Sequence, residues 1–332
     1  MSQAKTRRKA SWAGWLFAAA LIAGSLWVWF ERQYVVDAIQ YYQYQPTSAV
    51  EEISKKAKLT DSAKFTFYAT HPAVESSDAF NQHCERKEAN SPILGCYAAN
   101  RIFIFDVTDE RLKGIKAVTA AHELLHAEYD RLPTSEKERL KPLLQTAYDK
   151  VATPDLQERM KYYEKNEPGE EINELHSILG TEFASLSPEL EDYYRQYFHD
   201  RQAVVTLHEK VESVFSDLSK EATRLADQIE QLAHKINDET KQYNQGVEVL
   251  NQDVEAFNAR ASRAGGFTTQ SEFQAARQVL VDRSSTLNTL RQQIQTDIAT
   301  YKTLLARLES INAQSAKLNQ GLDSTLSEAP TI

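Results

Sequence analysis

Concentrated positive charge is largely missing from this sequence. The net charge is −9, and outside the first ten residues there is no block of lysine and arginine and no interleaving of basic with aromatic residues. A nucleic acid needs such a basic surface, so no nucleic-acid partner is expected. At 332 residues the chain is too long for one ordinary domain and predicts about two or three segments.

Cysteine and proline are also scarce. The two cysteines, Cys84 and Cys96, are not in a C-x-x-C spacing, which argues against a role as zinc ligands. Outside the cytoplasm they are expected to form a disulfide, and two unrelated buried thiols are the alternative. No proline occurs from residue 189 to residue 329, which permits long uninterrupted helices there.

A charge-free run lies near the N-terminus. It extends from Ser11 to Phe30, follows four basic residues and contains all four tryptophans, two near each end. About 20 apolar residues span a bilayer core as a helix. We therefore expect a cytoplasmic tail over residues 1–10, a transmembrane helix over residues 11–31 that contacts the lipid bilayer, and C-terminal domains outside the plasma membrane. A cleaved signal peptide is the alternative, although the run does not end in a small-x-small cleavage site.

The most specific chemical signal is a His-Glu-x-x-His motif formed by His122, Glu123 and His126. On a helix the two histidines lie one turn apart on the same face and can share one Zn²⁺, while Glu123 is placed to take a proton from water. With eight histidines in 332 residues, a chance match is expected in only about one of fifty such chains. The motif lies in a helix-like run over residues 111–132. A buried helix whose histidines bind core carbonyl groups is the alternative.

Residues 65–70 and 101–107 predict strands, because aromatic and β-branched side chains are frequent in both. Residues 75–100 are polar and predict a loop. A strand just before the motif helix can offer a sheet edge to an extended peptide beside the metal, although the sequence does not decide whether residues 101–107 form an edge strand.

After the motif the chain is predominantly helical. Apolar residues recur at steps of three and four on both sides of Gly265-Gly266. This spacing predicts a long antiparallel coiled-coil hairpin over residues 204–326, followed by a tail over residues 327–332. The hairpin is a candidate surface for a protein partner. Two independent helices that pair with other chains are the alternative.

A catalytic zinc site needs a third protein ligand. The metzincin motif requires Gly and His where Tyr129 and Leu132 stand here, so that class is excluded. Residues 173–177, Asn-Glu-Leu-His-Ser, resemble the Asn-Glu-x-x-Ser element of the gluzincin, or thermolysin-like, zinc peptidases. The resemblance covers two motifs within residues 115–185. It implies that Glu174 is the third ligand, that Asn173 contacts a zinc-bound imidazole, and that residues 32–203 form an α+β zincin-like domain, mostly helical with a small sheet.

The sequence leaves parts of the site open. The gluzincins often carry an acidic residue four positions after the glutamate, and Ile178 stands there; Asp106 or Asp130 could orient His122 instead. Other candidates for the third ligand are His176, Glu171 and Glu182. Candidates for stabilising the reaction's oxyanion are Tyr193, Tyr194, His199 and His176.

These features together predict a membrane-anchored, zinc-dependent metalloendopeptidase that hydrolyses peptide bonds in a peptide or protein substrate outside the plasma membrane. One Zn²⁺ per chain would be held by His122, His126 and Glu174, and water would be activated by the zinc and Glu123. A coiled-coil scaffold or adaptor with a catalytically inactive zincin domain is the main alternative. A zinc hydrolase that acts on a non-peptide envelope component is a third interpretation.

Overall fold

The computed structural model describes residues 12–84 and 92–325, except the side chains of residues 13, 14 and 26–30. The predicted tails over residues 1–10 and 327–332 lie outside this range. The chain divides into two compact units. The first unit comprises residues 1–214 and 319–332, and the second unit comprises residues 215–318.

A small sheet lies in the first unit. Its strands are β1 (Ala73–Glu75), β3 (Arg101–Phe105) and β2 (Gly95–Ala98), in that spatial order. β1 runs parallel to β3, and β2 runs antiparallel to it with Cys96 opposite Phe103. The strand predicted over residues 101–107 is therefore present, but it is the central strand. The edge strand that packs on the motif helix is β2.

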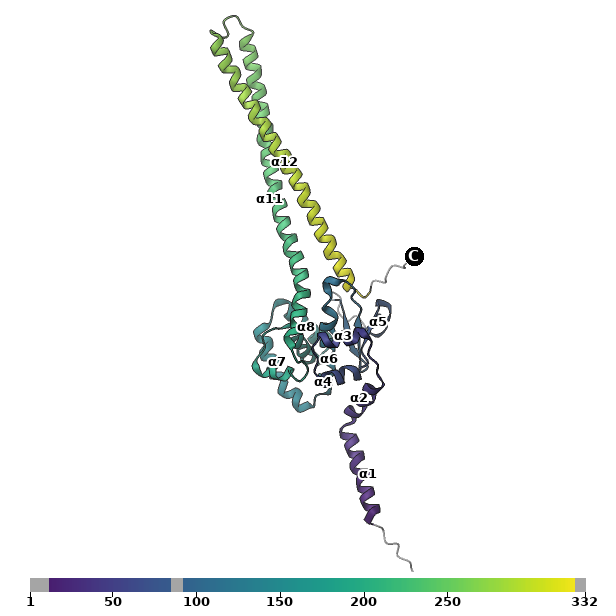
Figure 1. Ribbon diagram of the computed structural model, residues 1–332. Coiled ribbons are helices and arrows are strands. Elements are labelled where there is room, and N and C mark those ends of the chain that lie inside the picture. Colours follow the sequence, from purple (N-terminus) through teal and green to yellow (C-terminus); the bar gives the residue numbers. More distant parts are fainter. Residues whose placement is uncertain (1–11, 85–91, 326–332) are drawn as a thin grey trace, which may run out of the picture. The chain divides into compact units, whose positions relative to one another are not determined.

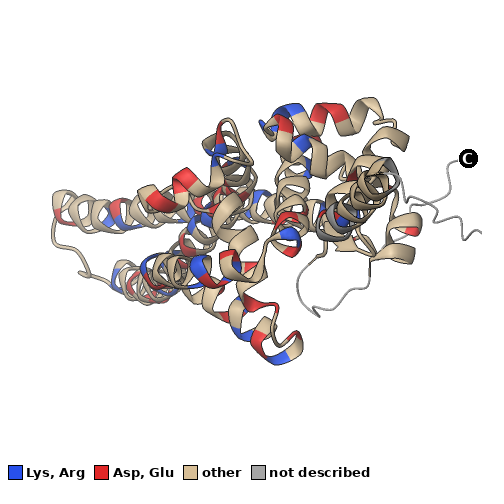
Figure 2. Ribbon diagram, turned by 90° about the horizontal axis from the view of Figure 1, so that it is seen from below, with Lys and Arg blue, Asp and Glu red and all other residues tan. Residues whose placement is uncertain are grey.

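Helices make up most of the first unit (Figure 1). The helices before the motif are α1 (Trp12–Phe30), α2 (Arg32–Gln43), α3 (Ser48–Lys56), α4 (Asp61–Ala69) and α5 (Ser77–His83). A 3₁₀ turn (Glu110–Leu112) then leads into the motif helix α6 (Ile115–Arg131), and the helices that follow it are α7 (Thr134–Val151), α8 (Pro154–Asn166), α9 (Glu171–Glu182) and α10 (Pro188–Tyr194). Acidic and basic residues are interspersed along the helical ribbons (Figure 2).

The prediction of a strand over residues 65–70 is wrong, because residues 65–69 belong to helix α4 and Thr70 caps its C-terminus. Thr60 caps that helix by accepting a hydrogen bond from the backbone N–H of Ala63. Ala63 and Phe67, one turn apart, are both fully buried, so the burial follows a helical period rather than strand alternation. The predicted loop over residues 75–100 likewise contains α5 and β2.

No helix in the described part of the chain is long and apolar enough to cross a membrane. The transmembrane helix predicted over residues 11–31 is therefore not supported, and the plasma-membrane location stays a prediction.

Cys84 and Cys96 form the predicted disulfide, with their Cα atoms 5.8 Å apart. Cys84 follows α5 and Cys96 lies in β2, so the bond ties a helix to the edge strand.

The second unit is formed by the long helices α11 (Arg201–Ala261) and α12 (Gln270–Leu322), each of which extends beyond it. Ion pairs join Glu221 to Arg307 and Lys235 to Asp297, so residue numbers rise along one helix as they fall along the other. The two helices are therefore antiparallel, as Figure 1 also shows. Gly265, with a φ of +77°, lies in the turn between them.

Candidate metal centre

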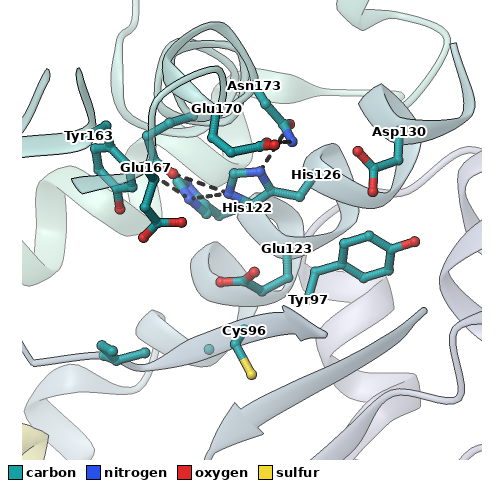
Figure 3. A pocket seen from close by; sticks show the side chains of 13 residues that line it. Cys96, Tyr97, His122, Glu123, His126, Asp130, Tyr163, Glu167, Glu170 and Asn173 are labelled. Atoms are coloured by element: carbon teal, nitrogen blue, oxygen red, sulfur yellow. Dashed lines mark hydrogen bonds and ion pairs between the residues drawn. The ribbon is translucent and has the colours of Figure 1, made fainter. Parts of the chain in front are cut away.

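Helix α6 presents two histidines from one face. His122 and His126 are one helical turn apart, and their Nε2 atoms lie 3.1 Å from each other. The rings stand nearly perpendicular, with centroids 4.8 Å apart (Figure 3). Two nitrogen lone pairs at this separation repel each other unless a proton or a cation lies between them.

Helix α9 supplies a carboxylate to the same point. Glu174 is 5% exposed, and its two oxygens lie 3.5 Å from His122 Nε2 and 3.2 Å from His126 Nε2. The three residues could hold a metal ion, since their ligand atoms all lie within 4.8 Å of one another.

The donor set passes a simple geometric test for such an ion. Two atoms bound to a tetrahedral zinc at about 2.0–2.1 Å are about 3.4 Å apart. The two imidazole nitrogens are 3.1 Å apart, and one oxygen of Glu174 is 3.2 Å from His126 Nε2, while its other oxygen is 3.5 Å from His122 Nε2. Two imidazoles and one carboxylate are also among the ligand sets of catalytic zinc sites, which leave one position open.

The other candidate ligands lie elsewhere. His176 is fully buried, and its Nε2 atom is 3.0 Å from the hydroxyl of Tyr193. Glu171 accepts a hydrogen bond from the backbone N–H of Gly169. Glu182 forms a bidentate ion pair with Arg159 at 2.7 and 2.9 Å. Of these candidates, Glu174 is the one whose carboxylate lies with the two histidines.

Asn173 orients the ring of His126. Its side-chain N–H donates to Glu170, 3.1 Å away, so its carbonyl oxygen faces the histidine. That oxygen lies 3.0 Å from His126 Nδ1 and accepts the hydrogen bond from it. With Nδ1–H bound to Asn173, Nε2 is the nitrogen that faces Glu174, and after loss of its proton it offers the lone pair that a metal requires.

Asp106 and Asp130, the two acids considered for orienting His122, have different surroundings. Asp106 is paired with Lys116, whereas Asp130 lines the cavity that contains the metal ligands. Neither has a hydrogen bond to His122 among the interactions of the described residues.

Glu123 lies between the histidines and the edge strand β2 (Figure 3). Its side chain is buried, and this burial raises the pKa of its carboxyl while the two imidazoles act in the opposite direction. Gly95 of β2 packs directly against it, because a Cβ at Gly95 would lie 2.9 Å from a carboxylate oxygen of Glu123 and 2.4 Å from a methyl carbon of Thr119. The strand and the proposed proton acceptor are therefore in contact.

A second contact to α6 fixes the edge strand near its other end. Arg131, at the end of α6, donates to the hydroxyl of Tyr97 in β2 at 3.1 Å. The same guanidinium binds both oxygens of Asp37 in α2, at 2.8 and 2.9 Å. Asp37 is 5% exposed, so this ion pair is buried and gives β2 a defined distance from the motif helix.

One contact holds α9 against α6, and a second ties the C-terminal end of α9 to α11. Gly180 permits close approach, since a Cβ there would lie 2.4 Å from Leu125 and 2.9 Å from Tyr194. Arg201 donates to the carbonyl oxygens of Phe183 and Ala184, at 2.7 and 3.1 Å, and so binds the carbonyl groups just beyond the C-terminus of α9. These contacts set the position from which Glu174 reaches the histidines.

Two cavities lie against the centre. The first, of about 440 Å³, extends toward Tyr97, Asp130 and Glu170. The second, of about 420 Å³, extends toward Leu94, Val118 and Arg159. Residues common to both linings are Ile93, Gly95, His122, Glu123, Tyr163 and Glu174. The cavities are therefore two lobes of one groove, with His122 and Glu174 lining both lobes and His126 lining the first.

The sequence motifs did not identify several residues of this groove. The candidate oxyanion donors Tyr193 and Tyr194 are buried in the core. Neither they nor the other candidates, His176 and His199, are among the residues that line the two lobes, whereas Tyr163 of α8 lines both. Gly95 and Tyr97 contribute through the edge strand. No motif spacing connects Tyr163 or these strand residues to the histidines, because the packing of α8 and β2 brings them together.

Comparison with known protein families finds no match to this chain. No curated protein and no solved structure matches it either. The chemical interpretation therefore depends on the geometry of the groove and on the two motifs.

Proposed function

We propose that the first unit is a zinc-dependent endopeptidase of the gluzincin type. The observation that supports this most is the convergence of His122 and His126 from α6 with Glu174 from α9, whose ligand atoms all lie within 4.8 Å of one another. The adjacent carboxylate of Glu123, which is 7% exposed, supplies the proton acceptor that peptide hydrolysis needs.

In the proposed reaction the zinc ion activates the water, and a side chain of the protein transfers the proton. Zn²⁺ acts as a Lewis acid and lowers the pKa of the attacking water. Glu123 accepts a proton from that water and then delivers it to the leaving amine. Its burial against Gly95 and the two histidines keeps bulk water away from the carboxylate and so favours this transfer.

The groove suits an extended peptide. β2 pairs with β3 along one edge, and Gly95, Cys96 and Tyr97 of β2 line the groove. A peptide added beside β2 would form backbone hydrogen bonds to the strand and bring a carbonyl group next to the ligands. Because lobes extend on both sides of the centre, residues before and after the scissile bond can be accommodated, which favours internal cleavage.

The disulfide supports an oxidising location for this unit. Disulfides persist in extracytoplasmic compartments and are rare in the cytoplasm. The Cys84–Cys96 bond therefore agrees with a peptidase that acts outside the plasma membrane.

The test is cleavage of a mixed peptide library by the purified full-length protein after zinc loading. We expect cleavage by the wild type and a loss of about 10³-fold in Glu123→Gln, with one zinc still bound per chain. Glu138→Gln, an exposed change on α7, is the matched control and should retain activity. Equal cleavage by the Glu123→Gln protein would remove Glu123 from the proposed chemistry.

A second candidate function is a scaffold whose helical hairpin binds a protein partner and whose metal domain is inactive. The apolar side chains exposed along the two long helices are available for such a contact; they are Val249, Val254, Val279, Val281, Ile298 and Leu305. A zinc-loaded wild-type protein that cleaves no member of the library would favour this function over the first.

A further inference from the structure

We propose that the Cys84–Cys96 disulfide is a positioning element of the proposed active site. By holding β2 from the face opposite Glu123, the bond sets the position of the strand along which a peptide would bind. Breaking the bond should lower the hydrolysis of extended peptides while zinc stays bound. This inference rests on the proposed peptidase function and names a covalent feature on which its substrate-binding edge depends.

The two faces of the sheet are covered by different helices. Cys96 of β2 lies opposite Phe103 of β3, and residues paired in this way share a face of the sheet. Neighbours along a strand alternate between the faces, so Gly95 and Tyr97 lie on the face opposite to that of Cys96. These two residues contact α6, where Gly95 meets Glu123. Figure 3 shows the sulfur of Cys96 directed away from Glu123.

On the face that carries Cys96, helix α5 is anchored to the sheet independently of β2. Phe80, which is 1% exposed, packs against Phe105 of β3 with ring centroids 5.8 Å apart. The ring of His83 stacks on Phe103 at 4.2 Å, and its Nδ1 atom lies 2.9 Å from the glutamate carboxylate of β1. Because Cys84 directly follows α5, the disulfide joins the edge strand to an element that is itself fixed.

The edge strand has few other interactions that could hold it in place. β2 is four residues long, and its side chains besides Cys96 and Tyr97 are a glycine hydrogen and an alanine methyl group. Among the described residues, β3 is the one strand that pairs with it. Such a strand buries little apolar surface of its own. Its position therefore depends on the pairing with β3, on the contact between Arg131 and Tyr97, and on the disulfide.

The candidate metal ligands come from elements other than β2. His122 and His126 lie on α6, and Glu174 lies on α9. Glu123, by contrast, is in contact with the strand, because a Cβ at Gly95 would lie 2.9 Å from its carboxylate. A displacement of β2 should therefore affect peptide binding and proton transfer while it leaves the zinc ligands in place.

The experiment compares the zinc-loaded, oxidised wild type with the double variant Cys84→Ala, Cys96→Ala, which has no thiol that could bind additional metal. The substrates are a long peptide and a blocked dipeptide with the same scissile bond, which is too short to pair along β2. We expect kcat/KM for the long peptide to fall about tenfold, chiefly through a higher KM, and kcat/KM for the dipeptide to fall less than about threefold. Zinc content should be the same in both proteins.

Reduction of the wild type breaks the same bond without a substitution. A water-soluble phosphine supplies the two electrons: it takes the oxygen of one water molecule to become the phosphine oxide, and the two protons of that water go to the two new thiols. Hydrolysis of the long peptide should fall as in the double variant and return on reoxidation. The same treatment should leave the double variant unchanged, which controls for effects of the phosphine on the metal.

A control variant separates positioning from general destabilisation. Leu140→Ala in α7 removes a fully buried side chain that is not among the described residues lining the two lobes. It should lower the midpoint of thermal unfolding and keep the wild-type ratio of kcat/KM between the long peptide and the dipeptide. An equal loss for both substrates in the disulfide variant, or an unchanged kcat/KM for the long peptide, would overturn the inference.

A binding measurement separates this inference from the proposed function. Zinc-loaded Glu123→Gln protein should bind extended peptides of the library about tenfold more tightly than the triple variant that also carries Cys84→Ala and Cys96→Ala. If the wild type cleaves no peptide but this difference in binding is found, the peptidase function is wrong and the positioning of β2 stands. Absence of cleavage together with equal binding by the two proteins would overturn both.

Discussion

The side chains around the proposed metal contribute different charges and hydrogen bonds. The imidazoles of His122 and His126 supply neutral nitrogen donors, and Glu174 supplies a negative charge that partly compensates the ion. Asn173 fixes the tautomer of one imidazole by accepting its Nδ1–H. Ligands alone would leave that ring free to rotate, so the centre depends on the amide as well.

Removing that amide should weaken metal binding without removing a ligand. Asn173→Ala is expected to lower zinc affinity about 10- to 100-fold, because the ring of His126 loses its orienting partner. Competition with a chromophoric chelator measures the change. Asn166→Ala, an exposed position at the end of α8, should bind zinc as the wild type does, and an unchanged affinity in Asn173→Ala would contradict the assigned role.

Zinc binding should also displace a proton. Burial alone would lower the pKa of His126, but its contact with Glu174 raises that pKa to about 9 in the metal-free site. The imidazole is therefore protonated at neutral pH and must lose its proton to bind zinc. Apparent affinity should rise with pH, by up to about tenfold per unit, and level off above about pH 9.

Isothermal titration in buffers of different ionisation enthalpy measures this exchange. Release of about one proton per zinc at pH 7 is expected. An affinity that stays constant between about pH 6.5 and 8.5 would show that His126 is neutral before the metal arrives.

Sequence spacing identified part of this residue-level arrangement. His122, Glu123 and His126 are close together on one helix, so helical geometry alone groups them. Glu174 lies far from His126 along the chain, on a different helix, and only the resemblance of residues 173–177 to a known element pointed to it. Asp130 lies one turn after His126 on the same helix, so helical spacing also places it at the groove, whereas Tyr163 reaches the groove through the packing of α8, which no local pattern encodes.

At the scale of elements, the site depends on the contact between α6 and α9. Gly180 makes this contact close, since any side chain there would meet Leu125 and Tyr194. Gly180→Ala should lower the free energy of unfolding by about 1–3 kcal/mol, because the helices must separate. It should also weaken zinc binding, since Glu174 moves with α9.

Urea unfolding and chelator competition check this prediction. Gly321→Ala is the control, because a Cβ at Gly321 meets no atom within 4 Å, and it should leave stability unchanged or raise it by up to about 1 kcal/mol. Equal free energies of unfolding for Gly180→Ala and Gly321→Ala would mean that α9 can move away from α6 without loss of stability.

Local patterns predicted helices better than strands. Thr153 and Pro154 are residue types typical of a helix start, and in the structure Thr153 caps α8 and Pro154 occupies its first turn. Aromatic residues at 65–68 resemble a strand, but the cap at Thr60 and the packing of Phe67 favour helix. β2 is short and follows a polar stretch, so its register depends on β3 rather than on its own composition.

At the scale of the whole molecule, the second unit is held by contacts of its own. Ile294 of α12 is 8% exposed, and ion pairs such as Lys235–Asp297 join the two long helices. Ile294→Asp should therefore destabilise the hairpin by about 3 kcal/mol, because a charge is buried. Thermal unfolding followed by circular dichroism should show this loss, while zinc affinity stays at the wild-type value.

Val281→Asp provides the control, since Val281 is 43% exposed on the same helix and should have little effect. A parallel fall in zinc affinity in Ile294→Asp would show that the metal centre depends on the hairpin.

The long helices of the second unit could be predicted from the sequence. Their apolar residues recur at steps of three and four, and this regular spacing is a local pattern that the sequence shows directly.

The most direct test of the central claim is the zinc content and X-ray absorption spectrum of the purified protein. One zinc per wild-type chain is predicted, bound by two imidazoles and a carboxylate at about 2.0–2.1 Å. Glu174→Ala should lose the metal, while Glu171→Ala, one turn away on the same helix, should keep it. A full zinc complement with unchanged imidazole and oxygen coordination in Glu174→Ala would contradict the account.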